Sequence, residues 1–533
     1  MSPEERRKIE QAPAGIIRNV EPYGGDWAGD QSNLPGWMES ISFPRDEKDI
    51  CDQLRDMARG GTLVTVQGMR TGISGGAVPQ GGHVLSLNKM TRFLGLSHDG
   101  QDGFGLSCQA GVLMREQIWP ATAKRQFDTT GWPEQSLDAL RAFAAGGTTL
   151  FAPDPSEPTV SVGGMVACNA SGARSYLYGA TRRHVRRVRM VLADSSVIEL
   201  CRGQARASGR NFSLTCRDGR TIAGPLPGYR MPAVKNAAGY FVADDMDLLD
   251  LLVGSEGTLG VISEVEVGLI LAPPMMTGVM ALLPSEASAF QLAGQARTWR
   301  FGPAVIEYFD HRCVEWMRER RDVFGPFQMG HEFPDAARYA LYLEFHGQEG
   351  EVAGAIAAVR TAAETLGATP DDLWVESGPD AIANFKQIKH IFPEQVNGLI
   401  ARRQETVPAI HKLGTDLAVP LDRLEALLAR QRADLAQAGL EHVVFGHLGQ
   451  ANLHVNILPR NAGEHQVGKG LLRQWARQAV SMGGTVSAEH GIGKLKHALL
   501  EEMYGSEGIE QMRRLKRLFD PHGLLCSGNI FEP

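Results

Sequence analysis

Residues 153–185 are the part of this sequence that most restricts its fold, because proline, glycine and small polar residues interrupt it throughout. Pro153 and Pro155 fix φ and lack an N–H donor, so we expect a rigid turn at the start. The rest is better suited to holding a large polar ligand through main-chain N–H groups than to filling a core. An ordinary glycine-rich loop is the alternative. The residues expected to face the ligand are Gly163, Gly164, Asn169, Ser171 and Gly172.

A second loop of the same kind precedes this stretch. Residues 62–67 have the composition of a strand and lead into Gly68–Gly76, which has four glycines in nine residues. Successive amides of such a loop are free to point at one anion. The loop lacks the G-x-G-x-x-G spacing, and the sequence has no Gly-Lys-Ser/Thr. It therefore indicates a phosphate-bearing cofactor without a Rossmann or P-loop site. A third glycine-rich segment, Gly254–Gly260, precedes the strand-like Val261–Val267.

Length and charge limit the classes of function. At 533 residues the chain is expected to form at least two domains with a large core. The formal net charge of -7 argues against a general nucleic-acid binder. No apolar run approaches the roughly 20 residues that span a bilayer, and Met1–Lys8 lacks the apolar stretch of a secretory signal. Seven scattered cysteines without a C-x-x-C pair argue against an iron–sulfur cluster and suit a reducing cytoplasm.

Local patterns predict several further elements. Residues 1–40 are expected to be a polar, irregular arm, and a helix is expected to begin near Asp46. Residues 126–150 show no clear hydrophobic periodicity, and residues 202–232 cannot be assigned to helices or strands. The remaining expectations are strands at 83–87, 304–309 and 339–345, a strand pair at 188–200, a short helix at 114–119 that Pro120 stops, and helices at 355–366, 406–413 and 421–438.

Pro273-Pro274 predicts a domain boundary. Strands and helices alternate beyond it, which predicts an α+β domain with an antiparallel sheet.

Two histidines in a predicted hairpin form the sharpest candidate site. Residues 442–447 and 452–458 are expected to be strands joined by a turn at 448–451. If residue 447 pairs near 452, His447 and His454 share a face as diagonal neighbours about 7–8 Å apart. Two imidazoles can close that gap on one ion, with metal–nitrogen bonds of about 2.1 Å. The alternative is that these are two of 15 histidines in ordinary structural or solvated roles.

Residues 487–493 offer a third ligand. Glu489 and His490 are adjacent, so a regular strand would point their side chains to opposite faces. Gly491 and Gly493 permit a turn that would bring both to one site.

Together, the three glycine-rich segments in this order resemble the FAD-binding domain of the vanillyl-alcohol oxidase / p-cresol methylhydroxylase flavoproteins. The resemblance covers roughly residue 40 to the end. His-x6-His with Glu489-His490-Gly491 resembles the divalent-metal motif of one branch, which holds D-lactate, glycolate and D-2-hydroxyglutarate dehydrogenases. Residues 66–72 and 412–420 look most like D-lactate dehydrogenases.

The resemblance implies an α+β fold: a two-subdomain FAD-binding domain of the p-cresol methylhydroxylase type, and an α+β substrate (cap) domain with an antiparallel sheet. The expected division is an arm at 1–40, the FAD-binding domain at 41–273 and the cap domain at 274–533, with a C-terminal tail that returns to the flavin.

The resemblance also implies the flavin contacts. The pyrophosphate would be held by Gly68, Arg70, Thr71, Gly72, Ser74, Gly75 and Gly76. Pro153, Asp154, Gly163, Gly164, Asn169, Ser171 and Gly172 would line the isoalloxazine and ribityl side. Glu256, Gly257 and the main chain of Ile262 would contact the adenosine half, and Asn529 would return to the ring. Residues 68–76 contain neither His nor Cys, so we expect non-covalent FAD, although Cys168 and His184 leave a covalent bond open.

For the metal, the resemblance implies His447, His454 and Glu489 as ligands. Two imidazoles and one carboxylate with open positions suit zinc or a similar ion. Gln450-Ala451 stands where many relatives have Asp-Gly, which leaves the identity or affinity of the metal open.

The same resemblance implies that His490 is the general base, since an imidazole near neutral pKa is suited to taking a hydroxyl proton. Orientation of Glu489 is its alternative role. Arg402 or Arg403 would bind the substrate carboxylate, and the sequence does not decide between them.

These features predict an FAD-dependent dehydrogenase of a D-2-hydroxy acid, first of all D-lactate, which it would oxidise to pyruvate. The metal would acidify the hydroxyl, His490 would take its proton, and hydride would pass to flavin N5. Glycolate and D-2-hydroxyglutarate are the alternative substrates, and a flavin electron-transfer subunit without substrate chemistry is the alternative class. The electron acceptor would be a quinone, a cytochrome, an electron-transfer flavoprotein or an iron–sulfur protein. The expected location is the cytoplasm; a peripheral position on the inner membrane face and a homodimer stay open.

Overall fold

A small parallel sheet carries the first glycine loop in the computed structural model of the protein. The structure describes residues 2–98, 100, 103–327, 330–331, 334 and 336–533. β3 (His83–Ser86) lies between β1 (Ser40–Ser42) and β2 (Val64–Gln67), and both pairs are parallel. The crossover helix α3 (Glu47–Gly60) begins after Asp46, whose side chain accepts the N–H of Asp49. The loop Gly68–Gly76 therefore leaves the carboxyl end of a parallel strand.

The second sheet of this half of the chain is antiparallel. Its order is β4-β5-β11-β7-β8 among the described residues, with β6 paired to β11. The strands are β4 (Phe93–His98), β5 (Phe104–Gln109), β6 (Thr149–Leu150), β7 (Val185–Val191), β8 (Val197–Cys201) and β11 (Val261–Leu271). β7, β8 and β11 confirm the strands expected at 188–200 and 261–267. Short helices lie around it: α4 (Trp119–Lys124), α5 (Glu134–Ala145), α6 (Val162–Cys168), α7 (Ser175–Tyr178), α8 (Thr181–His184) and α9 (Leu249–Leu252).

The expectation of an irregular arm at residues 1–40 was wrong. α1 (Pro3–Gln11) has a complete capping box between Ser2 and Glu5, and α2 (Gly24–Trp27) follows it. Trp27 is fully buried in a small cluster with Tyr23 and Phe43. α1 buries only Ile9, so its sequence carries no apolar period that would have revealed it.

Three other local expectations also differ from the structure. Pro120 does not stop a helix: a π-helical turn at Met114–Ile118 passes into α4, where Pro120 occupies the first turn and needs no N–H partner. Residues 134–145 of the region without a clear period form α5. The unassigned region 202–232 contains an antiparallel hairpin of β9 (Asn211–Thr215) and β10 (Thr221–Pro225).

After β11 the chain enters a larger sheet in which every pairing is antiparallel. Its order among the described residues is β15-β12-β14-β13-β17-β18-β16. This confirms the predicted α+β architecture with an antiparallel sheet. The strands are β12 (Met275–Leu283), β13 (Val305–Phe309), β14 (Tyr339–Gly347), β15 (Leu373–Ser377), β16 (Leu413–Gly414), β17 (His442–His447) and β18 (Asn452–Ile457).

Helices cover both faces of this sheet. Met280 and Phe445 pack with α11 (His311–Glu319), α12 (Arg321–Phe324) and α14 (Pro379–Gln404), whereas Val279 and Ala281 belong to the core on the opposite face. That second face lies toward α10 (Glu286–Thr298), α13 (Glu349–Thr365), α15 (Leu424–Ala438) and α16 (Ala462–Ser481). The helix predicted at 406–413 was wrong: α14 ends at Gln404, and Pro408 disfavours helical geometry at the residue before it.

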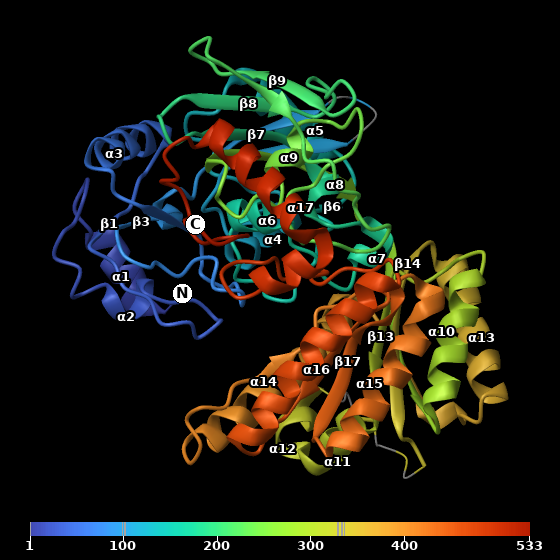
Figure 1. Ribbon diagram of the computed structural model, residues 1–533. Helices are drawn as coiled ribbons and strands as arrows, with labels where there is room; N and C mark the ends of the chain where they lie inside the picture. The colour runs from blue at the N-terminus through green and yellow to red at the C-terminus, as the bar shows by residue number, and fades with distance from the viewer. Residues whose placement is uncertain (1, 99, 101–102, 328–329, 332–333, 335) are drawn as a thin grey trace.

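Figure 1 shows these parts as two lobes, one with β1–β11 and the other with β12–β18. The C-terminal segment returns to the first lobe, where α17 (His497–Phe519) packs against β10 and Cys526 donates its N–H to Val64 of β2. Residues 485–494 connect the lobes, since Lys494 donates its N–H to Ser74 and Ala237 donates to Ser487. All seven cysteines are unbonded thiols. Within the described residues, no helix has both the length and the apolar composition needed to cross a membrane.

Candidate active site at the joint between the lobes

The predicted hairpin brings the two histidines together. β17 pairs with β18 so that His447 faces Asn452 and Phe445 faces His454, which confirms the expected register. His447 and His454 therefore share a face, and their ring centroids lie 5.6 Å apart. The turn between the strands includes Ala451 at φ 51°, a left-handed position that glycine adopts at lower cost.

Glu489 lies between the two imidazoles. His447 Nε2 is 3.2 Å from Glu489 Oε2, and His454 Nε2 is 3.1 Å from Oε1. The structure thus brings together all three predicted metal ligands. Lys235 donates from Nζ to Glu489 Oε2 at 2.6 Å, so the carboxylate also has a fixed cation beside it.

The outer nitrogens of both rings have acceptors as partners. His447 Nδ1 is 2.6 Å from the Glu307 carboxylate, and His454 Nδ1 is 2.9 Å from the carbonyl oxygen of Thr415. Because these oxygens only accept, each Nδ1 carries a proton, and each Nε2 faces the Glu489 carboxylate either with a second proton or with a lone pair. A lone pair and a carboxylate need a cation between them, either a proton or a metal ion. This donor set fits a divalent ion, with outer partners of the kind that orient histidine ligands.

Two more groups complete the cluster. Ligand atoms of Asp416, His454, Glu489 and His490 all lie within 4.8 Å of one another. The turn at residues 489–493 brings Glu489 and His490 to one site, as expected from Gly491 (φ 72°) and Gly493 (φ 52°). His490 Nδ1 is 3.3 Å from Asp416 Oδ2, and its ring stacks on His454 at 5.4 Å between centroids.

Burial and the surrounding charges set the protonation of the cluster. Burial lowers the pKa of His490, and the nearby Asp416 only partly opposes this, so the ring is neutral and can accept a proton. For His447, burial also acts to lower the pKa, but Glu307 and Glu489 raise it to about 9. The cations Lys235 and His447 hold the pKa of Glu489 well below its usual range against the effect of burial.

The first glycine loop has unsatisfied main-chain donors. Among the described residues, no acceptor is found for the N–H groups of residues 70–76. A row of free amides in such a loop suits an anionic group like a pyrophosphate. The Arg70 side chain does not face this loop's interior: at φ 58° it pairs with Glu5 at 2.6 Å and lies over the Trp27 ring. Thr71 is half-buried and Gly72 is exposed, whereas Ser74 and Gly75 are buried.

The central stretch divides between packing and polar contacts. Gly163 and Gly164 lie in the first turn of the buried α6, where a Cβ on Gly163 would sit 2.6 Å from that of Ala110. Gly163 therefore serves close packing, and the prediction that this stretch is poor core material was wrong for α6. A Cβ on Gly172 would lie 1.7 Å from the carbonyl oxygen of Asp154, next to the buried Pro153.

The polar residues of the same stretch face the joint between the lobes. Asp154 pairs with Lys386 of α14 at 2.9 Å. Asn169 accepts the N–H of Arg182 through its side chain, and Ser171 Oγ is buried without a partner among the described residues. An orphaned hydroxyl of this kind is what a bound ligand would satisfy.

The third glycine segment and the C-terminal tail meet the first loop. Glu256 accepts the main-chain N–H groups of Ile492 and Gly493, each at 2.7 Å. Asn529 donates to the carbonyl oxygens of Gly76 and Glu256, at 2.9 and 3.0 Å. Ser74 Oγ donates to the carbonyl oxygen of His490 at 2.8 Å, which joins the glycine loop directly to the histidine cluster. Gly257 (φ 75°) packs against Cys526, and Ile262 is buried in β11.

The structure does not bring the predicted arginines to the cluster. Arg402 is exposed near the end of α14, and Arg403 pairs with Glu441 and donates to the carbonyl oxygen of Leu458. These contacts lie at the end of the hairpin where His442 pairs with Ile457, five residues along β17 from His447. At about 3.4 Å per residue, this is about 17 Å from the histidine end.

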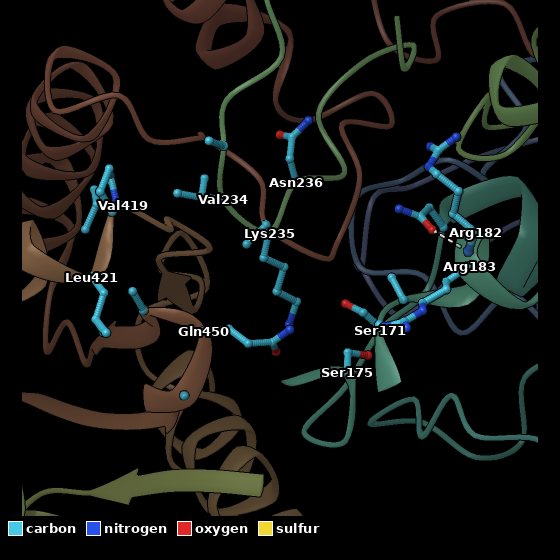
Figure 2. Close-up of a pocket in the computed structure, with 18 of the residues that line it drawn as sticks. Ser171, Ser175, Arg182, Arg183, Val234, Lys235, Asn236, Val419, Leu421 and Gln450 are labelled. Carbon is cyan, nitrogen blue, oxygen red and sulfur yellow. Dashed lines mark hydrogen bonds between the residues drawn. The ribbon is translucent and has the colours of Figure 1, made fainter. Parts of the chain in front are cut away.

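A cavity of about 720 Å³ opens beside the cluster. Figure 2 shows Ser171 and Arg183 on one side, Leu421 and Gln450 on the other, and Lys235 extending between them. Ala488, next to Glu489, also lines it.

Four residues of the cluster were missed by sequence reasoning. They come from four separate segments and are Asp416, Lys235, Glu307 and Lys389. Lys389 belongs to the cluster because its Nζ lies 3.9 Å from Glu307 Oε2. Glu307 could have been identified from the sequence, since it is the one charged residue of an otherwise apolar strand. Asp416 and Lys235 are placed by tertiary contacts that no local pattern records.

Comparisons with known proteins identify the family to which the chain is similar. The family profile described as FAD linked oxidases, C-terminal domain, matches residues 272–530, and the profile described as FAD binding domain matches residues 135–200. A D-lactate dehydrogenase from Archaeoglobus fulgidus is 30% identical over 91% of this chain and 90% of its own length. A D-2-hydroxyglutarate dehydrogenase from Xanthomonas citri is 28% identical over 98% of this chain and 96% of its own length.

The fold has a counterpart among solved structures. An alkyldihydroxyacetonephosphate synthase aligns over 99% of this chain and 86% of its own, with a TM-score of 0.60 and 13% sequence identity. At that identity the likeness concerns the fold.

Proposed function

Since this chain belongs to the family of FAD-linked oxidases, we propose that it is a dehydrogenase of D-2-hydroxy acids, with D-lactate as the first candidate substrate. The contact that carries the proposal is the hydrogen bond from Ser74 to His490. It joins a loop of free amides, which suits a dinucleotide, to the cluster of candidate metal ligands and to the neutral imidazole of His490.

The residues of the first lobe would hold FAD. The N–H groups of residues 70–76 would donate to the pyrophosphate, and Ser171, Asn169 and Asn529 would contact other polar parts of the cofactor. When bound, FAD supplies the acceptor for the hydrogen and two electrons that leave Cα. Burial raises the pKa of the Cys168 thiol to about 12, which disfavours the thiolate and supports non-covalent FAD.

The residues of the second lobe would act on the substrate hydroxyl. His447, His454 and Glu489 would hold a divalent ion, which when bound supplies positive charge that acidifies the hydroxyl. His490 would accept the hydroxyl proton at Nε2 while Asp416 holds Nδ1–H. The substrate would thereby lose one proton to His490 and its Cα hydrogen with two electrons, which leaves the 2-oxo acid.

The test is anaerobic mixing of the FAD-loaded protein with D-lactate, L-lactate, glycolate and D-2-hydroxyglutarate, followed by flavin absorbance. We expect loss of the oxidised flavin bands with D-lactate and none with L-lactate. If glycolate or D-2-hydroxyglutarate reduces the flavin faster than D-lactate does, that acid replaces D-lactate as the proposed substrate. Oxidised flavin with every acid would leave an electron-transfer subunit as the better description.

A further inference from the structure

Lys235 lies where the cavity meets the histidine cluster. Its Nζ is 2.6 Å from Glu489 Oε2 and 3.4 Å from Asn452 Oδ1, and its side chain is 6% exposed. The same side chain lines the cavity of about 720 Å³, and Figure 2 shows it extending between the two walls. It is therefore a buried ammonium in contact with both the cluster and the open volume.

The ammonium has donors left for a ligand. A lysine carries three N–H donors and no acceptor. Glu489 takes one of them, and the contact to Asn452 is long for a hydrogen bond. One donor on the cavity side is thus available for an anion, in a site where low solvent access strengthens a charge-assisted bond.

We propose that Lys235 binds the carboxylate of the substrate, the role that the sequence suggested for Arg402 or Arg403. The inference rests on the proposed function and names the residue that recognises the acid. A carboxylate held by Lys235 lies beside Glu489. The substrate hydroxyl is on the carbon next to the carboxylate. This contact would therefore orient the hydroxyl toward His447, His454 and His490.

The other cations of the cavity are less suited. Arg182 donates to the carbonyl oxygens of Asp250 and Val253, and Arg202 pairs with Asp250. Among the described residues Arg183 has no ion pair and no contact with Glu489 or the histidines, and it is exposed at the cavity wall. Arg183 is consequently the rival to be tested beside Lys235.

The experiment compares Lys235→Met, Lys235→Arg and Arg183→Ala with the wild type, all loaded with FAD and divalent metal. Reduction of the flavin is measured with D-lactate and with D-lactamide, which has the same hydroxyl but no carboxylate. Binding of oxalate, which has no hydrogen to lose, is followed by the change in flavin absorbance. Lys89→Met is the control, since its ammonium donates to the carbonyl oxygen of Ala12 away from the cavity.

We expect Lys235→Met to raise the KM for D-lactate and the Kd for oxalate on the order of 100-fold, and to leave the KM for D-lactamide within about threefold. Lys235→Arg should restore part of the affinity for both acids. The control and Arg183→Ala should retain the preference for acid over amide.

Three results would overturn the assignment. An unchanged preference in Lys235→Met would remove its role, and loss of the preference in Arg183→Ala alone would give the role to Arg183. If Lys235→Met raises the KM for D-lactate and for D-lactamide equally, the role of Lys235 is limited to supporting Glu489. If the wild type oxidises no hydroxy acid, the proposed function fails, while the oxalate titration still reports whether Lys235 binds a carboxylate.

Discussion

Asp416 holds His490 at two points. Its Oδ2 accepts the main-chain N–H of His490 at 3.0 Å and lies 3.3 Å from Nδ1 of the ring. The same carboxylate accepts from Ser487 Oγ at 2.7 Å and pairs with Lys496 at 3.1 Å. It is 4% exposed, and although burial acts to raise its pKa, His490 and Lys496 keep that pKa well below its usual range. Asp416 is therefore an anion that fixes the orientation and the tautomer of His490.

Replacing this anion should slow proton removal without releasing the cofactor. Asp416→Asn is expected to lower the rate of flavin reduction by D-lactate about 10²- to 10⁴-fold, because the amide can stabilise the wrong tautomer. Asp310→Asn is the matched control, since Asp310 is a buried carboxylate that accepts main-chain N–H groups of Cys313 and Val444 outside the site. Stopped-flow absorbance checks both variants, and equal rates in Asp416→Asn and the wild type would remove the positioning role.

Glu307 should control metal affinity through His447. Glu307→Gln removes the anion at Nδ1, so the ring becomes a weaker ligand, and we expect a 10- to 100-fold loss of affinity for a divalent ion. Competition with a chromogenic chelator measures this in the FAD-loaded protein. Glu376→Gln, at a half-buried position on β15 of the same sheet, should bind metal as the wild type does. Unaltered affinity in Glu307→Gln would place the ion away from His447.

The N-terminal helix should help to hold FAD. Glu5 pairs with Arg70 at 2.6 Å, and burial lowers the pKa of Arg70 while Glu5 opposes this. Glu5→Gln leaves a buried guanidinium without its anion at the start of the first glycine loop. We expect FAD to dissociate about tenfold faster, measured by the fluorescence of released cofactor after dilution. Glu4→Gln, which changes the neighbouring exposed carboxylate, should match the wild type, and equal release from both variants would separate the helix from FAD retention.

His83 should make the first lobe sensitive to acid. It is fully buried in the central strand β3, between Ser40 Oγ and Ser42 Oγ, and burial lowers its pKa to about 4. In the unfolded chain His83 has a pKa near 6.5 and therefore binds a proton, between pH 6.5 and pH 4, that it does not bind in the folded chain. This contribution to stability is complete above pH 6.5 and is lost as the pH falls toward 4, by up to about 3 kcal/mol.

The check is the midpoint of thermal unfolding between pH 7 and pH 4. His83→Asn keeps hydrogen-bonding groups but does not titrate, so its midpoint should fall less across this range than that of the wild type. Parallel curves for the two proteins would show that His83 contributes nothing to the acid sensitivity.

The histidine hairpin was predictable because its information is local. Sixteen residues contain both strands, the turn and the alternation that puts His447 and His454 on one face. The Glu489–His490 turn was equally readable from its two glycines. Asp416, Lys235 and Glu307 reach the same point from segments that lie far from it in the sequence. Their positions follow from how β16, β13 and residues 233–236 pack, which a single sequence does not specify.

The arginine prediction shows what chemistry alone cannot decide. Arginine is the geometric match to a carboxylate, and Arg402 and Arg403 stood in a plausible segment. Ile382, Phe385, Ile388, Phe392 and Val396 have helical spacing and are buried along α14. Pro393 lies within that run, and a proline there by itself disfavours a helix of this length. Because α14 does continue to Gln404, both arginines end at the far end of the sheet.

The most direct measurement is anaerobic titration of the FAD- and metal-loaded wild type and of a His447→Ala/His454→Ala double variant with D-lactate. We predict that the wild type loses its oxidised flavin bands with one equivalent of D-lactate, and that the variant retains FAD in the oxidised state. Equal reduction of the two proteins, or none in the wild type with any D-2-hydroxy acid, would contradict it.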